Sequence, residues 1–537
     1  MKPVNSFCRL IMQELNILLA SKHYPVDAEF VFCEPDPAMR TGKAMRLSIT
    51  EFGEKMRVKK ITSTLTATLA FAIIMTSSAI GQSANATGAG GPSAINKHVK
   101  SATAVGEVFG DGEKITAAIV EYDKDIDNSK LSASAFSVKD RTITKVYANS
   151  AAAKAAKGTN GRFVVIELNP DDESASILQG GPGRDKSQPP VTSLSNGPGG
   201  PGGPGGPGGP GGPGGPGAGG PPPNMPQTKR MPVKVSVAQV GEIAAVSGEK
   251  YAADANFFET NKAVNLIVDD FKQLTFKDPE NGNVLMYNLY IPKNYDKTKS
   301  YPMVLFMHDA SVDSEQHDRT LIQGLGAVVW ASPEDQAKHP AFVLAPQTHN
   351  VQTTSNDFKT TNMLETFVHL VQSVSNEYSI DKNRLYTTGQ SAGCMMSLAI
   401  NIKYPDLFAA SMLVAGQWDP QATSVLIHKN MWIVVSEGDL RAFPGMNASI
   451  AVWEKNGAKI TRGQWSAREP QDVQAANVAK MIAEGNNIRY TTFNKGTCLP
   501  PEQAKSGGQE HMASWQFAYA IPALRDWLFT QSKSPKP

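Results

Sequence analysis

The chain has 537 residues, of which 41% are hydrophobic and 19% charged, a length and composition that suit two or three globular domains. Its 52 Lys and Arg residues nearly balance its 50 Asp and Glu residues, and this balance argues against binding to nucleic acid or another polyanion. The four cysteines form no CxxC or Cys/His cluster with zinc-ligand spacing, so we expect no metal and no other cofactor.

The N-terminal region carries an export pattern that begins well inside the chain. Residues 56–60 are basic, and the apolar run that follows is densest at 69–75, too short for a bilayer span of about 20 residues. Small residues around Gly81 and Ala86 then suit signal peptidase. We therefore predict a signal peptide at 56–86, a secreted or periplasmic protein, and no membrane span after cleavage. Residues 1–55 are interpreted as a non-native upstream leader; a genuine long leader and an uncleaved anchor are the alternatives.

Residues 87–275 are predicted to form a β-sandwich module. Runs rich in β-branched residues occur at 105–109, 115–122, 134–138, 144–147, 162–168, 233–237 and 264–268, with short turns between most of them. Residues 180–230 interrupt this pattern with a Gly-Gly-Pro repeat, which is predicted to be a disordered, solvated tether. The repeat is interpreted as an insertion into one sandwich; alternatively, it separates two domains. A homo-oligomer could form through this module.

Residues 280–533 show the alternation typical of a doubly wound α/β domain. Strand-like runs are expected at 284–290, 303–307, 341–345, 384–387, 409–414, 431–435 and 488–493, with helical stretches between them. Because these runs are almost continuously apolar, they suit strands that are buried on both faces of a mainly parallel sheet.

The sequence Gly389-Gln390-Ser391-Ala392-Gly393 lies between the run at 384–387 and a helical stretch. A Gly-x-Ser-x-Gly in this position is typical of the nucleophile elbow of an α/β-hydrolase, in which the flanking glycines allow a tight turn that presents the serine. We predict Ser391 to be a catalytic nucleophile.

The same fold places an acid and then a histidine after the nucleophile. His511 follows the last predicted strand in a glycine-rich loop, whereas His428 precedes a strand and would lie at the wrong sheet edge. We therefore predict His511 as the general base. Asp439, after the run at 431–435, is the predicted orienting acid. Glu437 is a close rival for that role, and Asp419 and Asp472 are more distant ones.

An oxyanion hole needs two backbone N–H groups. One should come from Ala392 and the other from Asp309 or Ala310, after the run at 303–307. An anionic Asp309 would oppose the oxyanion, so its side chain should point away. Trp418 and Gln390 are the predicted substrate contacts.

After export, Cys394 and Cys498 are the cysteines that remain. An oxidising compartment would permit a disulfide between them. The alternative is two unpaired thiols, with Cys394 buried.

The stretches 381–393, with the elbow, and 404–410, with Tyr404-Pro405 at its start, resemble the secreted "predicted peptidase" esterases akin to polyhydroxybutyrate depolymerases and feruloyl esterases. Residues 301–308, 342–347 and 511–515 fit the same pattern. The resemblance implies an α/β-hydrolase with an N-terminal immunoglobulin-like module and a triad at Ser391, Asp439 and His511. Asp309, where a glycine is usual, departs from it.

Together these patterns predict a secreted serine carboxylic-ester hydrolase that acts through an acyl-enzyme on an ester-containing small molecule or polymer. A serine peptidase of the same fold is the alternative, and a non-catalytic surface-binding protein is a third hypothesis.

Overall fold

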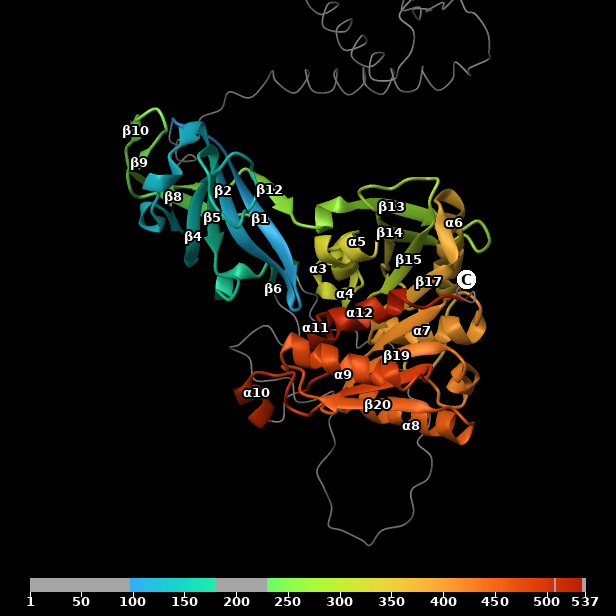
Figure 1. The fold of residues 1–537 in the computed structure, drawn as a ribbon. Helices are drawn as coiled ribbons and strands as arrows, with labels where there is room; N and C mark the ends of the chain where they lie inside the picture. The colour runs from blue at the N-terminus through green and yellow to red at the C-terminus, as the bar shows by residue number, and fades with distance from the viewer. Residues whose placement is uncertain (1–96, 180–228, 507–508, 534–537) are drawn as a thin grey trace, which may run out of the picture. The chain divides into compact units, whose positions relative to one another are not determined.

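The structure, a computed structural model, describes residues 97–179, 229–506 and 509–533 (Figure 1). The predicted leader (1–55), the predicted signal peptide (56–86) and all but the last two residues of the predicted tether (180–230) lie outside the described residues. Among the helices that are described, none is long and apolar enough to cross a membrane.

The β module contains two main sheets. The larger has the order β12-β1-β2-β5-β4 and the smaller the order β11-β8-β3. Val120 and Ile166 of the larger sheet and Val237 of the smaller sheet are fully buried in one hydrophobic core, as a sandwich requires. The bounds are β1 Val99–Phe109, β2 Gly112–Ile126, β3 Ser137–Val138, β4 Ile143–Asn149, β5 Gly161–Leu168, β8 Ser236–Gln239, β11 Asp254–Glu259 and β12 Lys262–Asn265; β9 Ile243–Ala244 and β10 Lys250–Tyr251 form a separate pair.

The prediction of a strand at 134–138 is wrong for the first two residues. Residues Ala133–Ala135 form a 3-10 turn instead, because the Ser132 side chain accepts a hydrogen bond from the Ser134 N–H and caps it.

The Gly-Gly-Pro segment is an insertion into the β module. On its two sides β6 (Leu178–Gln179) and β7 (Lys229–Arg230) pair in antiparallel fashion. Strands that follow the repeat also pair with strands that precede it, β8 with β3 and β12 with β1. The interpretation of the repeat as a separator of two domains is therefore wrong.

The C-terminal domain is organised around a nine-stranded sheet of order β13-β14-β16-β15-β17-β18-β19-β21-β20. Its pairs are parallel from β16 onward, and β13 and β14 add an antiparallel edge. The bounds are β13 Phe271–Lys277, β14 Val284–Tyr290, β15 Tyr301–Met307, β16 Phe342–Gln347, β17 Ile380–Gln390, β18 Ala410–Val414, β19 Asn430–Ser436, β20 Ile460–Trp465 and β21 Ile488–Phe493. Every residue of β15, β16 and β18 is buried, which explains their continuous apolar sequence.

The sheet begins before residue 280, where the sequence analysis placed the boundary of this domain. β13 forms a hairpin with β14, closed by a hydrogen bond from the Asp278 N–H to the carbonyl of Asn283. Lys and Gln residues along this exposed edge strand hide the apolar pattern that the other strands show.

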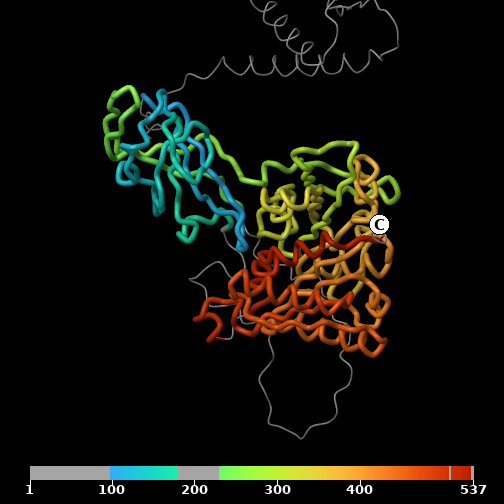
Figure 2. The backbone as a smooth tube through the Cα atoms, in the orientation of Figure 1, coloured from blue at the N-terminus to red at the C-terminus, as the bar shows by residue number. Residues whose placement is uncertain are grey.

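Two groups of helices cover the sheet (Figure 1). In one group α6 (Met363–Glu377) packs on α7 (Ala392–Lys403), which contacts β17; in the other α12 (Pro522–Phe529) packs on α9 (Gln471–Ala483) and α11 (Ala513–Tyr519). The remaining helices are α3 Arg319–Ile322, α4 Leu325–Val328, α5 Pro333–Lys338, α8 Ala442–Lys455 and α10 Pro501–Lys505. After α12 the chain runs back to the edge at which β17 begins (Figure 2), where the Lys533 N–H donates to the carbonyl of Asn383 at 3.0 Å.

Candidate active site

Ser391 lies on a strained turn between β17 and α7. Its backbone has φ 53° and ψ −118°, a conformation that L-residues rarely adopt outside functional sites. Both neighbouring glycines are required by close backbone approach. A Cβ on Gly389 would lie 2.6 Å from the Met307 carbonyl oxygen, and one on Gly393 would lie 1.9 Å from the same oxygen. The turn therefore presents Ser391 at the carboxyl end of β17, as in a nucleophile elbow.

His511 joins Ser391 to Asp439 in one chain of hydrogen bonds. His511 Nε2 lies 2.9 Å from Ser391 Oγ, and His511 Nδ1 lies 2.5 Å from Asp439 Oδ2. The three residues come from the end of β17, the loop before α11 and the loop after β19. The structure thus brings together the three residues that sequence reasoning selected for a triad, in an order that permits proton transfer from the serine to the imidazole.

Asp439 is held as a carboxylate by its surroundings. Its burial would raise the pKa of this carboxyl, but the hydrogen bond and charge of His511 outweigh burial and lower the pKa below its usual range. The backbone N–H groups of Arg441 and Ala442 also donate to Oδ1 at 3.0 and 2.9 Å. The carboxylate can therefore orient the imidazole and stabilise its protonated form.

The rival acids are occupied elsewhere. Glu437 accepts hydrogen bonds from Gln464 Nε2 at 2.7 Å and from the Lys495 N–H at 3.2 Å. Asp419 accepts from the Ala422 N–H at 2.7 Å, and Asp472 lies in the first turn of α9. His428 is exposed and precedes β19, at the edge opposite Asp439.

The loop after β15 is fixed next to the elbow. Asp309 is buried, and its Oδ1 accepts from Ser311 N–H at 2.9 Å, so its side chain caps the turn Ala310–Val312. The Asp309 carboxylate thus bonds within its own loop through Oδ1, and its direction relative to an oxyanion stays a prediction. Ala392 begins α7, where free backbone N–H groups collect.

His308 anchors the same loop. The Thr348 N–H donates to His308 Nε2 at 3.1 Å, so the neutral ring carries its proton on Nδ1 and donates it to the Asp309 carbonyl at 2.7 Å. Burial lowers the pKa of His308, which favours this neutral form.

The two predicted substrate contacts are both turned inward. The Gln390 side chain is buried, and its amide donates to Asp309 Oδ2 at 3.3 Å and to Gln323 Oε1 at 3.2 Å. Trp418 is 5% exposed and packs against Phe358 with ring centroids 5.5 Å apart. This placement favours positioning and packing roles over direct contact with a substrate.

Glu510, which sequence reasoning missed, connects the loops that carry the acid and the base. It is 1% exposed, and its carboxylate accepts from Ser436 Oγ at 2.7 Å and from the Gly496 N–H. A Cβ on Gly438 would lie 2.1 Å from Glu510 Oε1, so that glycine makes room for the carboxylate. The one feature of the sequence that could have indicated a role for Glu510 is its position directly before His511. We assign Glu510 as a positioning residue for His511 and Asp439.

The cysteines are not joined. Cys394 and Cys498 are both free and buried, so of the two possibilities left open, a disulfide and two unpaired thiols, the structure has the thiols. Cys394 packs against Gly416. Burial and the charge of Glu510 raise the pKa of the Cys498 thiol to about 12. Neither thiol is a nucleophile at neutral pH. In the described part of the chain, no three His, Cys, Asp or Glu side chains are grouped to hold a metal ion.

Comparison with known proteins places this geometry in context. Residues 101–252 match the family "Esterase Ig-like N-terminal domain", and residues 353–433 match the prolyl oligopeptidase family. A solved structure described as a thermostable esterase is 28% identical with a TM-score of 0.62, covering 81% of this chain and 100% of its own. These matches and the sheet order confirm the α/β-hydrolase fold and the immunoglobulin-like module, and confirm the resemblance to esterases.

Two curated relatives are more distant. A poly(3-hydroxyalkanoate) depolymerase C of Paucimonas lemoignei is 24% identical over 270 residues, which cover 46% of this chain and 58% of the relative. A probable feruloyl esterase C of Aspergillus terreus is 26% identical over 137 residues, 26% of this chain and 48% of the relative. The chain thus spans about half the length of each.

Proposed function

We propose that this protein hydrolyses carboxylic esters through a covalent acyl-enzyme on Ser391. The observation that carries the proposal is the hydrogen-bonded chain from Ser391 through His511 to Asp439 at a strained elbow. A serine hydroxyl is a weak nucleophile until a base takes its proton, and His511 Nε2 lies within reach of that proton.

In the acylation step, Ser391 Oγ attacks the ester carbonyl carbon while its proton moves to His511 Nε2. The carbonyl oxygen becomes an oxyanion, which the backbone N–H of Ala392 and one from Asp309 or Ala310 would stabilise. The bond to the alcohol oxygen then breaks, and His511 returns its proton to that oxygen. Asp439 stabilises the imidazolium that exists between the two proton transfers.

In the deacylation step, His511 takes a proton from water as the water oxygen attacks the acyl carbon. The bond to Ser391 Oγ breaks, the proton returns to Oγ, and the carboxylic acid leaves. The buried carboxylate of Glu510 keeps the His511 loop in register with the Asp439 loop through both steps.

Two exposed apolar side chains directly follow the proposed acid and base in the sequence. Leu440, directly after Asp439, is 67% exposed, and Met512, directly after His511, is 42% exposed. We propose that these two side chains contact the hydrocarbon part of an ester. The similarity to a poly(3-hydroxyalkanoate) depolymerase and a probable feruloyl esterase supports an ester-containing small molecule or polymer as the substrate. The export pattern at 56–86 supports a secreted or periplasmic enzyme.

The proposal is tested with the protein from residue 87 onward and its Ser391→Ala variant. Both are assayed on nitrophenyl esters of increasing acyl length, on feruloyl esters and on a peptide panel, and both are treated with a fluorophosphonate probe. We expect ester turnover and stoichiometric labelling in the wild type only, because removing a triad nucleophile lowers kcat by about 10⁴- to 10⁶-fold. Similar turnover in the two proteins would exclude Ser391 as the nucleophile.

A serine peptidase is the second candidate, favoured by the match of residues 353–433 to the prolyl oligopeptidase family. It predicts that the peptide panel is cleaved with kcat/KM at least equal to that of the esters. The third hypothesis, a non-catalytic surface-binding protein, predicts no labelling by the fluorophosphonate. Assembly into a homo-oligomer through the β module stays a proposal for sedimentation analysis.

A further inference from the structure

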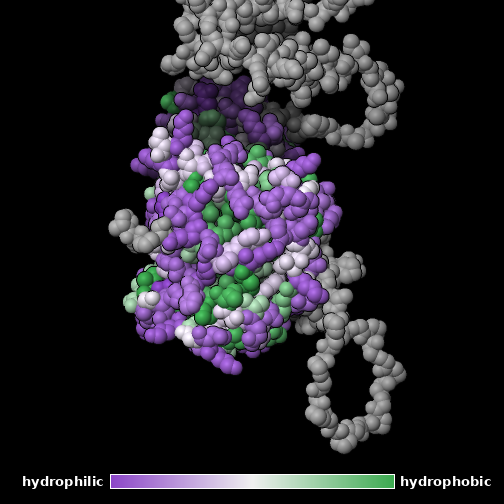
Figure 3. All heavy atoms as spheres, turned by 90° about the vertical axis from the view of Figure 1, so that its right-hand side faces the viewer, coloured by the Kyte–Doolittle hydropathy of each residue, from purple (hydrophilic) through white to green (hydrophobic). Residues whose placement is uncertain are grey.

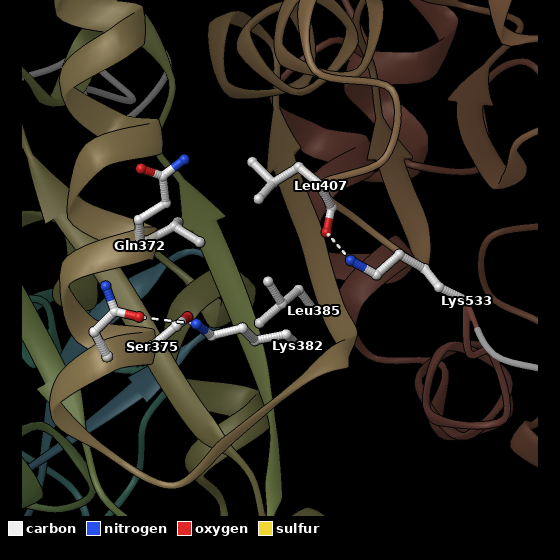
Figure 4. A pocket seen from close by; sticks show the side chains of 8 residues that line it. Gln372, Ser375, Lys382, Leu385, Leu407 and Lys533 are labelled. Carbon is white, nitrogen blue, oxygen red and sulfur yellow. Dashed lines mark hydrogen bonds between the residues drawn. The ribbon is translucent and has the colours of Figure 1, made fainter.

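A hollow of about 310 Å³ opens beside the beginning of β17, away from the catalytic residues (Figure 4). It lies between α6, β17, the loop before β18 and the segment after α12; its lining is Val371, Gln372, Ser375, Asn376, Lys382, Leu385, Leu407 and Lys533. Its volume is at the lower end of the range for sites that hold small organic molecules. Leu385 precedes Ser391 by six residues of extended chain, roughly 20 Å, so this hollow is separate from the active site.

The hollow combines an apolar floor with a polar rim. Val371 and Leu385 are buried and Leu407 is half-buried, whereas Gln372, Asn376 and Lys382 are exposed. The view onto the side where α6 and the C-terminus lie shows apolar side chains reaching the surface among polar ones (Figure 3). This division suits a ligand with a hydrocarbon body and a polar head.

Ser375 contributes a buried hydroxyl that no described residue satisfies. Its side chain is 7% exposed, and within the described residues its Oγ has no hydrogen-bond partner. Figure 4 shows the Ser375 side chain on α6 facing the hollow opposite Leu385. Leaving a buried hydroxyl unpaired is unfavourable, so a ligand atom that bonds to it would be stabilised.

Two lysines supply positive charge with hydrogen-bonding capacity to spare. Lys382 Nζ donates to Asn376 Oδ1 at 2.8 Å, and Lys533 Nζ donates to the carbonyls of Asp406 and Leu407 at 2.9 and 3.1 Å. An ammonium group carries three donors, so two remain on Lys382 and one on Lys533.

The two nearest carboxylates are each paired with another cation. Asp381 pairs with Arg384 at 2.7 Å, and Asp406 pairs with Lys429 at 3.5 Å. Burial lowers the pKa of Lys533, and the charges of Asp406 and Asp381 oppose this lowering only in part.

We propose that this hollow binds a small organic carboxylate, with its hydrocarbon body on Leu385 and Leu407 and its carboxylate beside Lys382 and the Ser375 hydroxyl, while Lys533 adds positive charge from the opposite side of the hollow (Figure 4). Inorganic anions lack the body that the apolar floor requires, and neutral alcohols lack the charge. The site makes no use of Ser391, so it does not depend on the proposed ester hydrolysis.

The test follows the methyl resonances of Leu385 and Leu407 by NMR in the full chain with Leu methyl labels, assigned with Leu385→Met and Leu407→Met. Hexanoate is the probe, and acetate, hexan-1-ol and inorganic phosphate are the comparison ligands. We expect hexanoate to shift both resonances in a saturable manner and to bind on the order of tenfold more tightly than each comparison ligand, since a charge-assisted hydrogen bond and a buried chain each add this much.

A double variant, Lys382→Met with Lys533→Met, should weaken hexanoate binding roughly tenfold, whereas Lys455→Met on α8 should leave it unchanged. Ser375→Ala removes the unpaired hydroxyl without a steric change and should weaken binding a few-fold while the protein stays folded. Unshifted Leu385 and Leu407 resonances, equal affinity in the double variant, or phosphate binding as tight as that of hexanoate would each overturn the proposal. Ester turnover enters none of these readouts, so their failure says nothing about Ser391.

Discussion

Glu113 in β2 allows a quantitative test of how the β module depends on pH. Its side chain is fully buried, and burial raises its pKa from 4.5 to about 7 despite an opposing ion pair with Arg230. Its Oε2 lies 3.3 Å from Arg230 Nη2, but Oε1 has no partner in the described part of the chain. The unpaired Oδ1 of Asn265 approaches the same point, since a Cβ on Gly106 would lie 2.7 Å from Glu113 Oε1 and 2.8 Å from Asn265 Oδ1.

The sign and size of the effect follow from proton linkage. Below pH 4.5 the carboxyl is protonated in both the folded and the unfolded chain. Between pH 4.5 and about 7 the unfolded chain loses the proton and the folded chain keeps it, so the free energy of unfolding falls as pH rises. A difference of about 2.5 pKa units at 1.36 kcal/mol each gives a total loss of about 3 kcal/mol, complete above pH 7.

Glu113→Gln should remove this loss because the amide stays neutral and can donate to Asn265 Oδ1. The variant should be less stable than, or equal to, the wild type at pH 4.5, and the difference should move in its favour by about 3 kcal/mol by pH 8. All seven tryptophans lie after residue 271, so fluorescence does not report on this module. The measurement is therefore native-state hydrogen exchange of peptides from β1 and β2, corrected for intrinsic rates. Glu173→Gln, an exposed change in the same module, is the control. A difference curve that stays flat from pH 4.5 to 8 would refute the reasoning.

Three further predictions concern the catalytic domain. Glu510→Gln should lower kcat about 10- to 100-fold with KM nearly unchanged, because a lost charge-assisted hydrogen bond amounts to about 1.5–3 kcal/mol; steady-state kinetics on esters measure this, and a change in KM alone would contradict it. Gly393→Ala should abolish fluorophosphonate labelling and lower the Tm, because its Cβ would lie 1.9 Å from the Met307 carbonyl oxygen; unchanged labelling would disprove that contact. Dithiothreitol should leave the Tm unchanged, and a thiol titration after denaturation should find Cys394 and Cys498 both reactive; a reductant-dependent Tm would restore the disulfide.

The central strands could be predicted because a strand that is buried on both faces of the sheet has an almost continuously apolar sequence. The runs at 284–290 and 488–493 coincide with β14 and β21. β20 (Ile460–Trp465) was not predicted because it is an edge strand, in which Thr, Arg, Gly and Gln follow one another between a single apolar residue at each end. Exposed edges carry a weaker pattern than the interior, and so the outer strands were the ones missed.

Ser391, Asp439 and His511 could be predicted for two reasons. The elbow motif identifies the position of the serine, and the order of the three residues along the chain restricts where the acid and the histidine can lie. What could not be predicted is what each side chain contacts. Gln390 is adjacent to Ser391 in sequence, yet its amide bonds to Asp309 and Gln323. Cys394 and Cys498 lie on two catalytic segments, yet they are unbonded thiols. Glu510 matters through partners that are more than ten residues distant, a tertiary property that no local motif carries.

The pairing of β6 with β7 separates the insertion from the rest of the β module. Because these two short strands hold the ends of the insertion together, the number of repeats between them is decoupled from the packing of the sandwich. The sandwich therefore accepts inserted chain between Gln179 and Lys229, and we expect a foreign domain grafted at this position to leave the pairing of β6 with β7 intact.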